Sequence, residues 1–585
     1  MRGHVQHVAD DAESIDGAQE LARRRLFHVC REPGSTHQCY RHADHAGERR
    51  MRERHCAVHC HVKPMARSLF SAYVESGLQS SALLPSAFGD RDARKLAVAR
   101  AAARPTSPAL IAELRAQQAA FPKSAARERA LETLARPGAA AVLTGQQVGL
   151  FLGPLYTIYK AATAIVLAEA LAVETGTPVV PVFWMATEDH DLAEIDHCSI
   201  ARGSDTPLRL RVSADGRVDA RAPVFDALLG ADVAAAVDAA CEAIAGRPAG
   251  AEIAALLAEH YVPGRRFADA FGGLLAALFA DEGLIVFHPR TPAVAALAAP
   301  VFRHALLHAG AANERLLARD AALAEAGFES QVHVRADAAL LFAHDERGGR
   351  QLVRLEDAAA RAADVATDPT RFSSSALLRP IVQNSLFPTA AYVGGPAECS
   401  YFGQCAALYD LFDLPVPLVA PRARFRLVDA RTHARLGALG LRPADAEQPL
   451  DKLLATVGAR RPAPIQPGEL RAAILDAPLE ALASLPARIG IADRELARAF
   501  NRTRATLERA VDRLTARYAR TLALRDEAGG GALHRAQALL FPDGEPQERV
   551  FAFPSFAADS GARAFVTAII AAVKPFDPAV QDLER

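Results

Sequence analysis

The chain has little lysine, one tryptophan, no long apolar run and almost no net charge. Six of its 67 basic residues are lysines, and 67 basic against 68 acidic residues leave a formal charge of −1. Without an excess of basic residues, the protein lacks the positive electrostatic field that attracts nucleic acid or an anionic membrane surface. No uninterrupted apolar run reaches the roughly 18 residues of a membrane span. We therefore expect a soluble protein that binds neither nucleic acid nor membrane.

Cysteine is scarce and is poorly placed for a disulfide framework. Four of the eight cysteines precede Met65, and the others are Cys198, Cys241, Cys399 and Cys405. This scatter fits a reducing compartment, so we predict a cytoplasmic protein. Cys399 and Cys405 show no spacing typical of a Cys–His dyad, and we interpret them as small buried apolar side chains.

Residues 1–64 differ in composition from the rest of the chain. They hold nine of the 19 histidines and have no apolar segment typical of a secretory signal. Thiols and imidazoles at 55–61 resemble soft-metal ligands, but no second ligand pair follows at zinc-finger spacing. We predict that 1–64 is a non-native or disordered leader from an over-long gene start, with Met65 as the initiator. No tightly bound metal is expected.

Apolar runs separated by glycine and proline predict a parallel sheet. Runs at 139–143, 178–186, 283–287 and 390–393 have the length of buried strands, and an amphipathic stretch at 154–171 separates the first two. Strand, helix and strand in succession indicate an α/β fold with helices on both sheet faces. Segments at about 200–280 and 300–385 are too long for simple crossovers, so we expect insertions in a doubly wound core. Residues 65–137 are predicted to be mainly helical.

A helical region follows the predicted core. Residues 491–524 lack glycine and proline, and their apolar side chains recur in steps of three, four and seven: Leu496, Phe500, Leu507, Val511, Leu514 and Tyr518. This stripe is typical of a coiled coil or helical hairpin and predicts a packing or dimer seam. Three glycines at 529–531 are expected to end the helix. The predicted domains are the leader at 1–64, the core at 65–430, the coiled coil at 431–530 and a tail packed on the core at 531–585.

Three polar clusters each follow a predicted strand, where the carboxyl ends of parallel strands form a ligand crevice. The first runs from Thr144 to Lys160, and its candidate binding residues are Gly145, Gln146, Gln147, Gly149, Gly153, Tyr156 and Lys160. Its glycines permit close backbone approach, and a helix capped by Gly153 would point free N–H groups at a phosphate or carboxylate. The alternative is a tight glycine turn that packs helix on sheet.

The second cluster concentrates charge directly after the strand that holds the only tryptophan. It contains Glu188, Asp189, His190 and Asp191. These carboxylates can bind an amino group, a sugar hydroxyl or Mg²⁺, and His190 can transfer a proton. We predict a catalytic role for all four. A helix start with acids complementing the dipole is the alternative, and it leaves His190 unexplained.

In the third cluster a strand again ends in glycines, and a proline opens a helix. Gly394, Gly395 and Glu398 are its candidate binding residues, and Arg379 upstream can pair with a carboxylate or phosphate. An ordinary strand-to-helix turn is the alternative.

Taken together, the clusters closely resemble the BshC family, the proposed cysteine ligases of bacillithiol biosynthesis. The resemblance rests on LTGQQVGLF at 143–151, GPLYTIYK at 153–160, PVFWMATEDHD at 181–191, LLRP at 377–380 and AYVGGPAE at 391–398. It extends over about 65–585 and includes QVH at 331–333, PR at 421–422 and QERV at 547–550. Through this resemblance His333 joins the candidate binding residues.

The resemblance implies a Rossmann-like core with two connecting-peptide insertions and a helical coiled-coil domain that supports a homodimer. It also implies that cysteine is added to the amine of glucosaminyl malate to give bacillithiol. Relatives that perform the analogous mycothiol step activate cysteine with ATP as an adenylate and carry an H-x-G-H signature. The matching positions, 151–154, contain no histidine. By analogy with the cysteine activation in these relatives, ATP, with or without Mg²⁺, is the expected cofactor.

These assignments give a mechanistic hypothesis. ATP forms an acyl-adenylate with its phosphates on the 145–153 loop and Lys160, while the acidic cluster holds an amine and His190 acts as general base. Arg379 and the 394–398 turn hold the malate carboxylates. Two alternatives remain. One is a nucleotide-dependent ligase or nucleotidyltransferase that acts on another aminosugar, and the other is a non-catalytic dimeric nucleotide-binding scaffold.

Overall fold

A computed structural model describes residues 68–75, 83–84, 87–202, 206–217, 219–489, 493–525 and 527–584. The chain divides into two units, residues 1–64 and 65–585, and all described residues belong to the second. The predicted leader therefore lies outside the described residues, as does its cluster of thiols and imidazoles.

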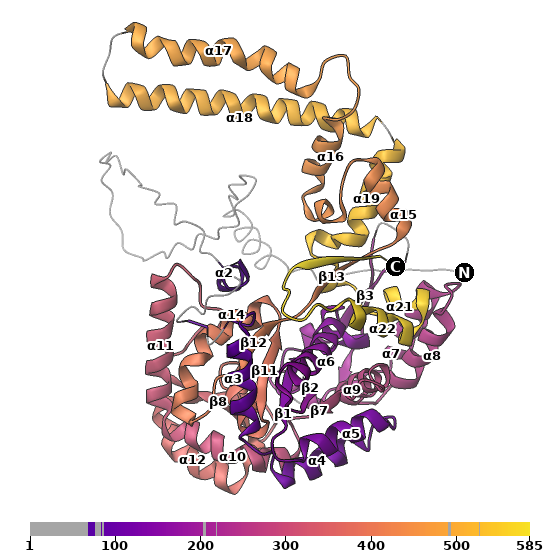
Figure 1. The fold of residues 1–585 in the computed structure, drawn as a ribbon, viewed down its shortest axis with the longest axis vertical. Helices are drawn as coiled ribbons and strands as arrows, with labels where there is room; N and C mark the ends of the chain where they lie inside the picture. Colours follow the sequence, from indigo (N-terminus) through magenta and orange to yellow (C-terminus); the bar gives the residue numbers. More distant parts are fainter. Residues whose placement is uncertain are drawn as a thin grey trace, which may run out of the picture. The chain divides into compact units, whose positions relative to one another are not determined.

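Five parallel strands form the central sheet, in the order β12-β11-β1-β2-β7 (Figure 1). Their bounds are β1 Ala140–Gln146, β2 Val179–Met185, β7 Ile285–Phe287, β11 Thr389–Gly394 and β12 Leu418–Pro421. The chain starts in the middle, moves to one edge and then returns past β1 to the other, as in a doubly wound Rossmann sheet. The predicted strands are confirmed, while β12 was missed. The point where the strand order reverses lies between β1 and β11.

Helix α6 (Tyr156–Thr175) connects β1 to β2 and is apolar on almost every side. It is long and apolar enough to cross a membrane, the only single helix in the described chain of which this holds, yet most of it is buried in the fold. A helix that is apolar all round belongs in a core, and α6 packs on both β1 and β2. Gly176 ends it in the left-handed conformation, with φ +71°.

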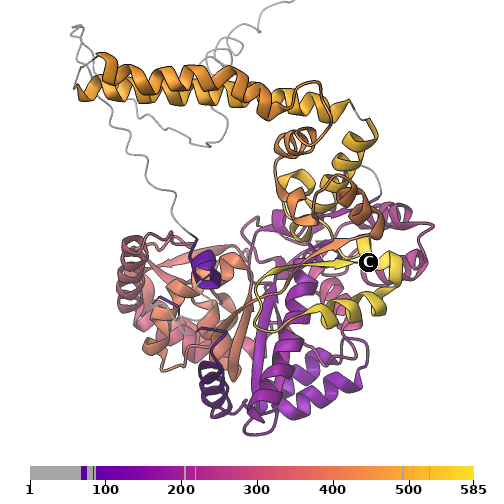
Figure 2. The same ribbon diagram turned by 45° about the horizontal axis from the view of Figure 1, so that its top comes forward.

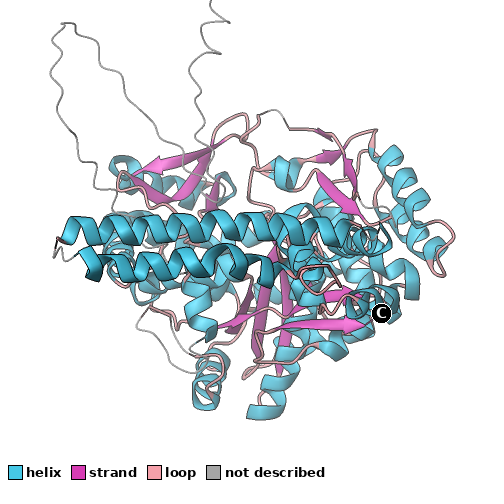
Figure 3. Cartoon of the chain, turned by 90° about the horizontal axis from the view of Figure 1, so that it is seen from above, coloured by secondary structure: helices cyan, strands magenta, loops and turns pink. Residues whose placement is uncertain are grey.

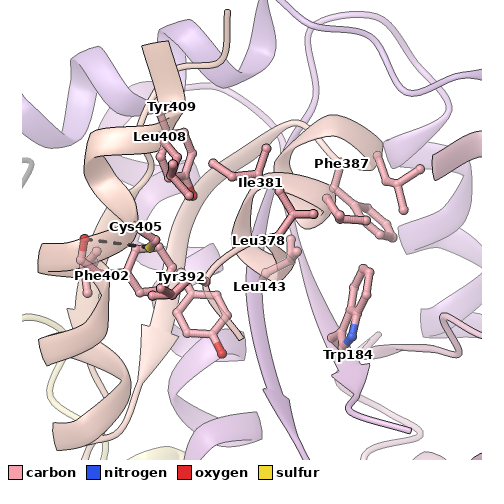
Figure 4. Packing of buried hydrophobic residues seen from close by; sticks show 14 of the residues in the cluster. Leu143, Trp184, Leu378, Ile381, Phe387, Tyr392, Phe402, Cys405, Leu408 and Tyr409 are labelled. Carbon is pink, nitrogen blue, oxygen red and sulfur yellow. Dashed lines mark hydrogen bonds between the residues drawn. The ribbon is translucent and has the colours of Figure 1, made fainter. Parts of the chain in front are cut away.

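Alternate residues of β2 serve two hydrophobic cores, because successive side chains point to opposite sheet faces. Val182 and Trp184 belong to one core, whereas Phe183 and Met185 belong to the other. Figure 4 shows part of the first core, with the indole of Trp184 directed toward Phe387. Burial on both faces explains why these strands read as continuous apolar runs.

The other helices and strands of the core surround this sheet. The helical stretch before β1 comprises α2 Leu69–Glu75, α3 Arg91–Ala102, α4 Pro108–Gln118 and α5 Ala125–Leu134. The first predicted insertion holds β3 His197–Ile200, β4 Leu208–Arg211, β5 Ala214–Asp215, β6 Leu228–Leu229, α7 Val233–Ile244, α8 Gly250–His260 and α9 Phe267–Leu278. After β7 come α10 Pro292–Leu307, α11 Ala309–Glu325, β8 Ala338–His344, β9 Arg350–Arg354, α12 Ala358–Thr367, β10 Phe372–Ser374 and α13 Arg379–Leu386. Strands β10, β8 and β9 form a separate antiparallel sheet.

The last third of the chain is largely helical. Helix α14 (Pro396–Cys405) follows β11, and β13 (Arg424–Val428) leads to α15 Ala430–Ala438, α16 Leu450–Gly458, α17 Pro467–Ile489, α18 Arg494–Leu524 and α19 Glu527–Leu540. The tail comprises α20 Gln547–Val550, α21 Pro554–Ser560, α22 Ala562–Ala572 and β14 Val580–Glu584. Strand β14 pairs in parallel with β13, so the tail returns to the strand from which the helical region starts.

Helices α17 and α18 lie side by side as a long hairpin (Figures 2 and 3). The apolar stripe predicted on α18 is divided between environments. Val511 is buried, whereas Leu507 and Leu514 are exposed. The expected break at the three glycines is wrong, because α18 ends at Leu524 and α19 runs through residues 529–531. The predicted boundary at 530 accordingly falls inside α19.

Candidate functional site

A cleft of about 910 Å³ opens at the point where the strand order reverses. This is where open α/β sheets bind ligands, because the helices on either side leave a crevice beyond the strand ends. The predicted residues that line it are Gly145, Gln146, Gln147, Tyr156, Lys160, Asp189, Arg379, Gly395 and Glu398. All three sequence clusters therefore contribute to one cleft.

The first cluster forms a tight loop between β1 and α6. A Cβ atom on Gly145 would lie 2.7 Å from the backbone oxygen of Trp184 on the neighbouring strand, so this position requires glycine. Phe151, Leu152 and Gly153 all have positive φ, and the first two are fully buried. Such backbone strain persists only where packing determines it.

The predicted cap at Gly153 is wrong. Gly153 has φ +62°, and α6 begins later, at Tyr156, with Leu155 as its N-cap. The N–H of Leu155 donates to the backbone oxygen of Phe551 at 2.8 Å. The C-terminal tail thus covers part of the helix start that was expected to face a ligand.

Lys160 projects from α6 to the floor of the cleft and is only 3% exposed. Its ammonium donates to the Gly145 oxygen at 2.7 Å and to Gln146 Oε1 at 2.8 Å, and it forms an ion pair with Glu398. An ammonium has three donors, and three protein groups take them here. This geometry favours Lys160 as a link between β1 and α14 over the phosphate ligand expected from the sequence.

Glu398 is the other half of this pair and also closes the first turn of α14. It accepts hydrogen bonds from Tyr392 Oη at 2.7 Å and from the Gly395 N–H at 2.8 Å. Burial raises the pKa of the Glu398 carboxyl, but Lys160 and the hydrogen bonds outweigh it and leave the pKa below its usual value. The carboxylate is therefore held ionised by the groups around it.

The second cluster divides between several environments. Asp189 lines the cleft, where Gln147 Nε2 donates to it at 3.0 Å and joins it to the first cluster. Burial raises the pKa of Asp189, but the hydrogen bond from the His190 N–H and the nearby Arg350 lower it overall. Asp191 caps the short 3₁₀ helix at 192–194 by accepting from the Ala193 N–H, as the structural alternative predicts.

Several predicted residues lie away from the cleft. Glu188 lines a second, inner cavity of about 270 Å³ that shares Trp184 with the cleft. Residues that line neither cavity are Gly149, Gly153, His190, Asp191, His333 and Gly394. His190 and His333 are exposed. The loop before His333 is held by the buried Gln404, whose Oε1 accepts from two backbone N–H groups at 3.0 Å.

Arg379 is distinct among the cations that line the cleft. Lys160, Arg209, Arg211, Arg422 and Arg549 each pair with a carboxylate. Within the described chain Arg379 has no carboxylate at ion-pair distance, and its guanidinium donates to Tyr401 Oη at 2.8 Å. The nearby tyrosines and Glu398 outweigh desolvation and raise the pKa of Arg379, so it stays charged. It is the cleft cation with the most capacity for an incoming anion.

Comparison with known proteins gives the family. Residues 57–423 match the model for the N-terminal Rossmann-like domain of the bacillithiol biosynthesis protein BshC, and residues 472–583 match that of its C-terminal coiled-coil domain. The chain belongs to the BshC family. The first match begins a few residues before Met65, within the segment that was predicted to be a leader.

Curated BshC relatives cover most of the chain. A protein from Solibacter usitatus is 35% identical over 463 residues, which are 77% of this chain and 85% of the relative. One from Salinibacter ruber is 34% identical over 483 residues, 80% of this chain and 87% of its own. A protein from Geobacillus kaustophilus is 30% identical over 467 residues, which are 75% of this chain and 83% of the relative. Each is named "Putative cysteine ligase BshC".

In this BshC chain the tail supplies part of the cleft, which the sequence alone did not show. Glu548 of α20 accepts two hydrogen bonds from the guanidinium of Arg422, each 2.8 Å long, and both side chains are almost fully buried. The backbone N–H of Arg422 donates to the backbone oxygen of Gly394 at the end of β11. The only earlier signal was that both residues fall in segments resembling the family.

Two further cleft residues were not selected from the sequence. Glu194 lies at the end of the acidic run and lines the cleft. Although Glu194 is exposed, its partial burial is the main cause that raises the pKa of its carboxyl, and Asp189 and Asp191 raise it further against a hydrogen bond from Gln147. Arg209 reaches the cleft from β4 and pairs with Asp543 at 2.6 Å. Among the described residues no three His, Cys, Asp or Glu side chains gather as metal ligands.

Replacing Glu548 by Gln should destabilise the protein by about 3–5 kcal/mol at neutral pH, because it leaves the buried Arg422 without its countercharge. The pKa of Glu548 is lowered in the fold, since Arg422 and Arg424 outweigh burial. Its contribution is therefore present above the unfolded pKa of the carboxyl and is lost as the pH falls. Thermal unfolding from pH 7 to pH 2 should show a constant difference down to about pH 5 and convergence of the two proteins only at lower pH. Glu545→Gln, at an exposed pair with Arg549, is the matched control; an equal loss there would contradict the assignment.

Proposed function

We propose that this chain is an ATP-dependent ligase that joins the carboxyl group of L-cysteine to the amine of glucosaminyl malate, which gives bacillithiol. The observation that carries the proposal is that the cation Arg379 and the acids Asp189 and Glu194 line the same cleft. A substrate with both an amine and carboxylates requires opposite charges of this kind. The names of the BshC relatives supply the amino acid and the reaction class.

Arg379 is the proposed ligand for the malate carboxylates. A guanidinium binds a carboxylate through two parallel hydrogen bonds, and within the described chain the guanidinium of Arg379 makes one hydrogen bond, to Tyr401 Oη. The more buried cations, Lys160 and Arg422, are held by Glu398 and Glu548. Their release would uncover buried charge, which makes Arg379 the better anion ligand.

The rim of the cleft suits the phosphates of ATP. Arg209, Arg211 and Arg549 line it, and each forms an ion pair although its own side chain is more than half exposed. Exposed pairs contribute little to stability, so these arginines can exchange a carboxylate for a phosphate at small cost. We infer that the nucleotide binds toward this rim.

Proton removal from the attacking amine is assigned to Glu194. A general base must lie within reach of the substrate, and Glu194 lines the cleft whereas His190 does not. The raised pKa of Glu194 also brings it closer to the range where a carboxylate accepts a proton at neutral pH. Asp189, with its lowered pKa, is better suited to bind the ammonium form of the amine.

The decisive assay combines the purified protein with ATP, L-cysteine and glucosaminyl malate. Mass spectrometry should detect bacillithiol together with equimolar AMP. Formation of bacillithiol without AMP would support the ligation but contradict activation through an adenylate. No product with any aminosugar would contradict the proposal and favour a nucleotide-binding scaffold.

A pair of variants tests the base. Glu194→Gln should lower kcat by about 10²–10⁴-fold, the usual contribution of a general base, while His190→Ala should stay within about threefold of the parent. Steady-state kinetics with matched melting temperatures would separate chemistry from folding. If His190→Ala were inactive and Glu194→Gln active, the role predicted from the sequence would be correct and this one wrong.

A further inference from the structure

The inner cavity lies between the ends of β2 and β7, helices α10 and α13, and β10. Its volume is about 270 Å³, and its wall is largely apolar, with Trp184, Phe225, Phe302, Phe372, Val294 and Val382 among its residues. Trp184 also lines the cleft. The cavity therefore adjoins the polar cleft and differs from it in chemistry.

Two charged side chains face this apolar space. Arg290 is held in place, because one terminal nitrogen donates to the backbone oxygens of Thr370 and Phe372 at 3.1 and 3.2 Å and the other lies 3.4 Å from His344 Nδ1. Glu188 is less constrained, since its one hydrogen bond in the described structure comes from Ser374 Oγ at 3.1 Å. One carboxylate oxygen thus remains for a ligand.

Two residues that line the cavity also carry unsatisfied polar atoms within the described structure. Trp184 Nε1 and Arg290 Nε are buried and have no hydrogen-bond partner. Buried polar groups are normally hydrogen-bonded, so an unpartnered donor on a cavity wall requires an explanation.

We propose that the inner cavity is the subsite for the amino-acid substrate, with the thiol side chain against the aromatic wall and the α-ammonium group on Glu188. The α-carboxyl group points past Trp184 into the cleft, where the other substrates reach it. This inference rests on the proposed function, in which the amino acid is cysteine.

The chemistry of the wall selects this ligand. Sulfur makes favourable contacts with aromatic rings, whereas a hydroxyl group loses its hydrogen bonds to water in such a space. Glu188 and Arg290, the two charged residues that line the cavity, have opposite charges and so match the two ends of a zwitterion. Burial raises the pKa of the Glu188 carboxyl overall, and Arg290, Arg350 and Arg379 act against it.

A ligand series on the unmodified protein tests the subsite directly. Calorimetry would compare L-cysteine with L-2-aminobutyrate, which replaces the thiol by a methyl group, with L-serine, and with 3-mercaptopropionate, which lacks the ammonium group. 2-Aminobutyrate should bind within about threefold of cysteine, since both place an apolar group in the cavity. Serine and 3-mercaptopropionate should each bind at least about tenfold more weakly. Serine as tight as cysteine would overturn the inference.

Two substitutions on α10 locate the site. Ala298 lines the cavity, so Ala298→Phe should fill it and abolish cysteine binding. Ala296 is exposed on the same helix, and Ala296→Phe should bind cysteine like the parent. Glu188→Gln should weaken the binding of cysteine at least about tenfold and leave the affinity for 3-mercaptopropionate unchanged. Melting temperatures would confirm that each variant folds.

The outcomes separate this inference from the proposed function. If bacillithiol forms while Ala298→Phe leaves cysteine affinity unchanged, the subsite is wrong and the ligase stands. If cysteine binds as predicted but no product forms with glucosaminyl malate, the subsite stands and the proposed acceptor is wrong.

Discussion

The cleft depends on one largely buried ion pair, Lys160 with Glu398. The pair joins α6, which follows β1, to α14, which follows β11. The order of the sheet reverses between β1 and β11. Each partner also holds backbone: Lys160 binds the Gly145 oxygen, and Glu398 binds the Gly395 N–H. The two turns that form the floor of the cleft are therefore fixed relative to each other by charge. A pair of this kind is costly to bury, and it specifies an arrangement more than it adds stability.

The C-terminal tail completes what this pair begins. Arg422 and Glu548 form a second buried pair beside the first, and the tail also covers the start of α6 through Phe551. The cleft is consequently assembled from the first strand of the sheet and from residues near the end of the chain. The cations at its floor, Lys160 and Arg422, are held in buried ion pairs. Arg379 and the exposed arginines at the rim can still bind ligands. This division between structural and available cations is the basis of the proposed substrate placement.

The sequence predicted the parallel sheet because its strands are continuous apolar runs bounded by glycine and proline. It also predicted that three clusters meet, since parallel strands end at one edge. It failed where a side chain has two chemically reasonable partners. The sequence placed Lys160 among the candidate binding residues, but only the structure shows Glu398 and two oxygens around its ammonium. The acidic run was read as one unit, whereas Glu188, Asp189 and Asp191 lie in three environments. Long-range pairing such as Arg422 with Glu548 leaves no local pattern to read.

A double-mutant cycle on the melting temperature tests the central claim most directly, with Lys160→Met, Glu398→Gln and the combined variant. Each single change should lower the melting temperature markedly, because it leaves the charge of the other residue buried without its partner. The combined variant should lose much less than the sum of the two, since neither charge is then stranded. Strictly additive losses, or single variants as stable as the exposed control Lys95→Met, would contradict the account.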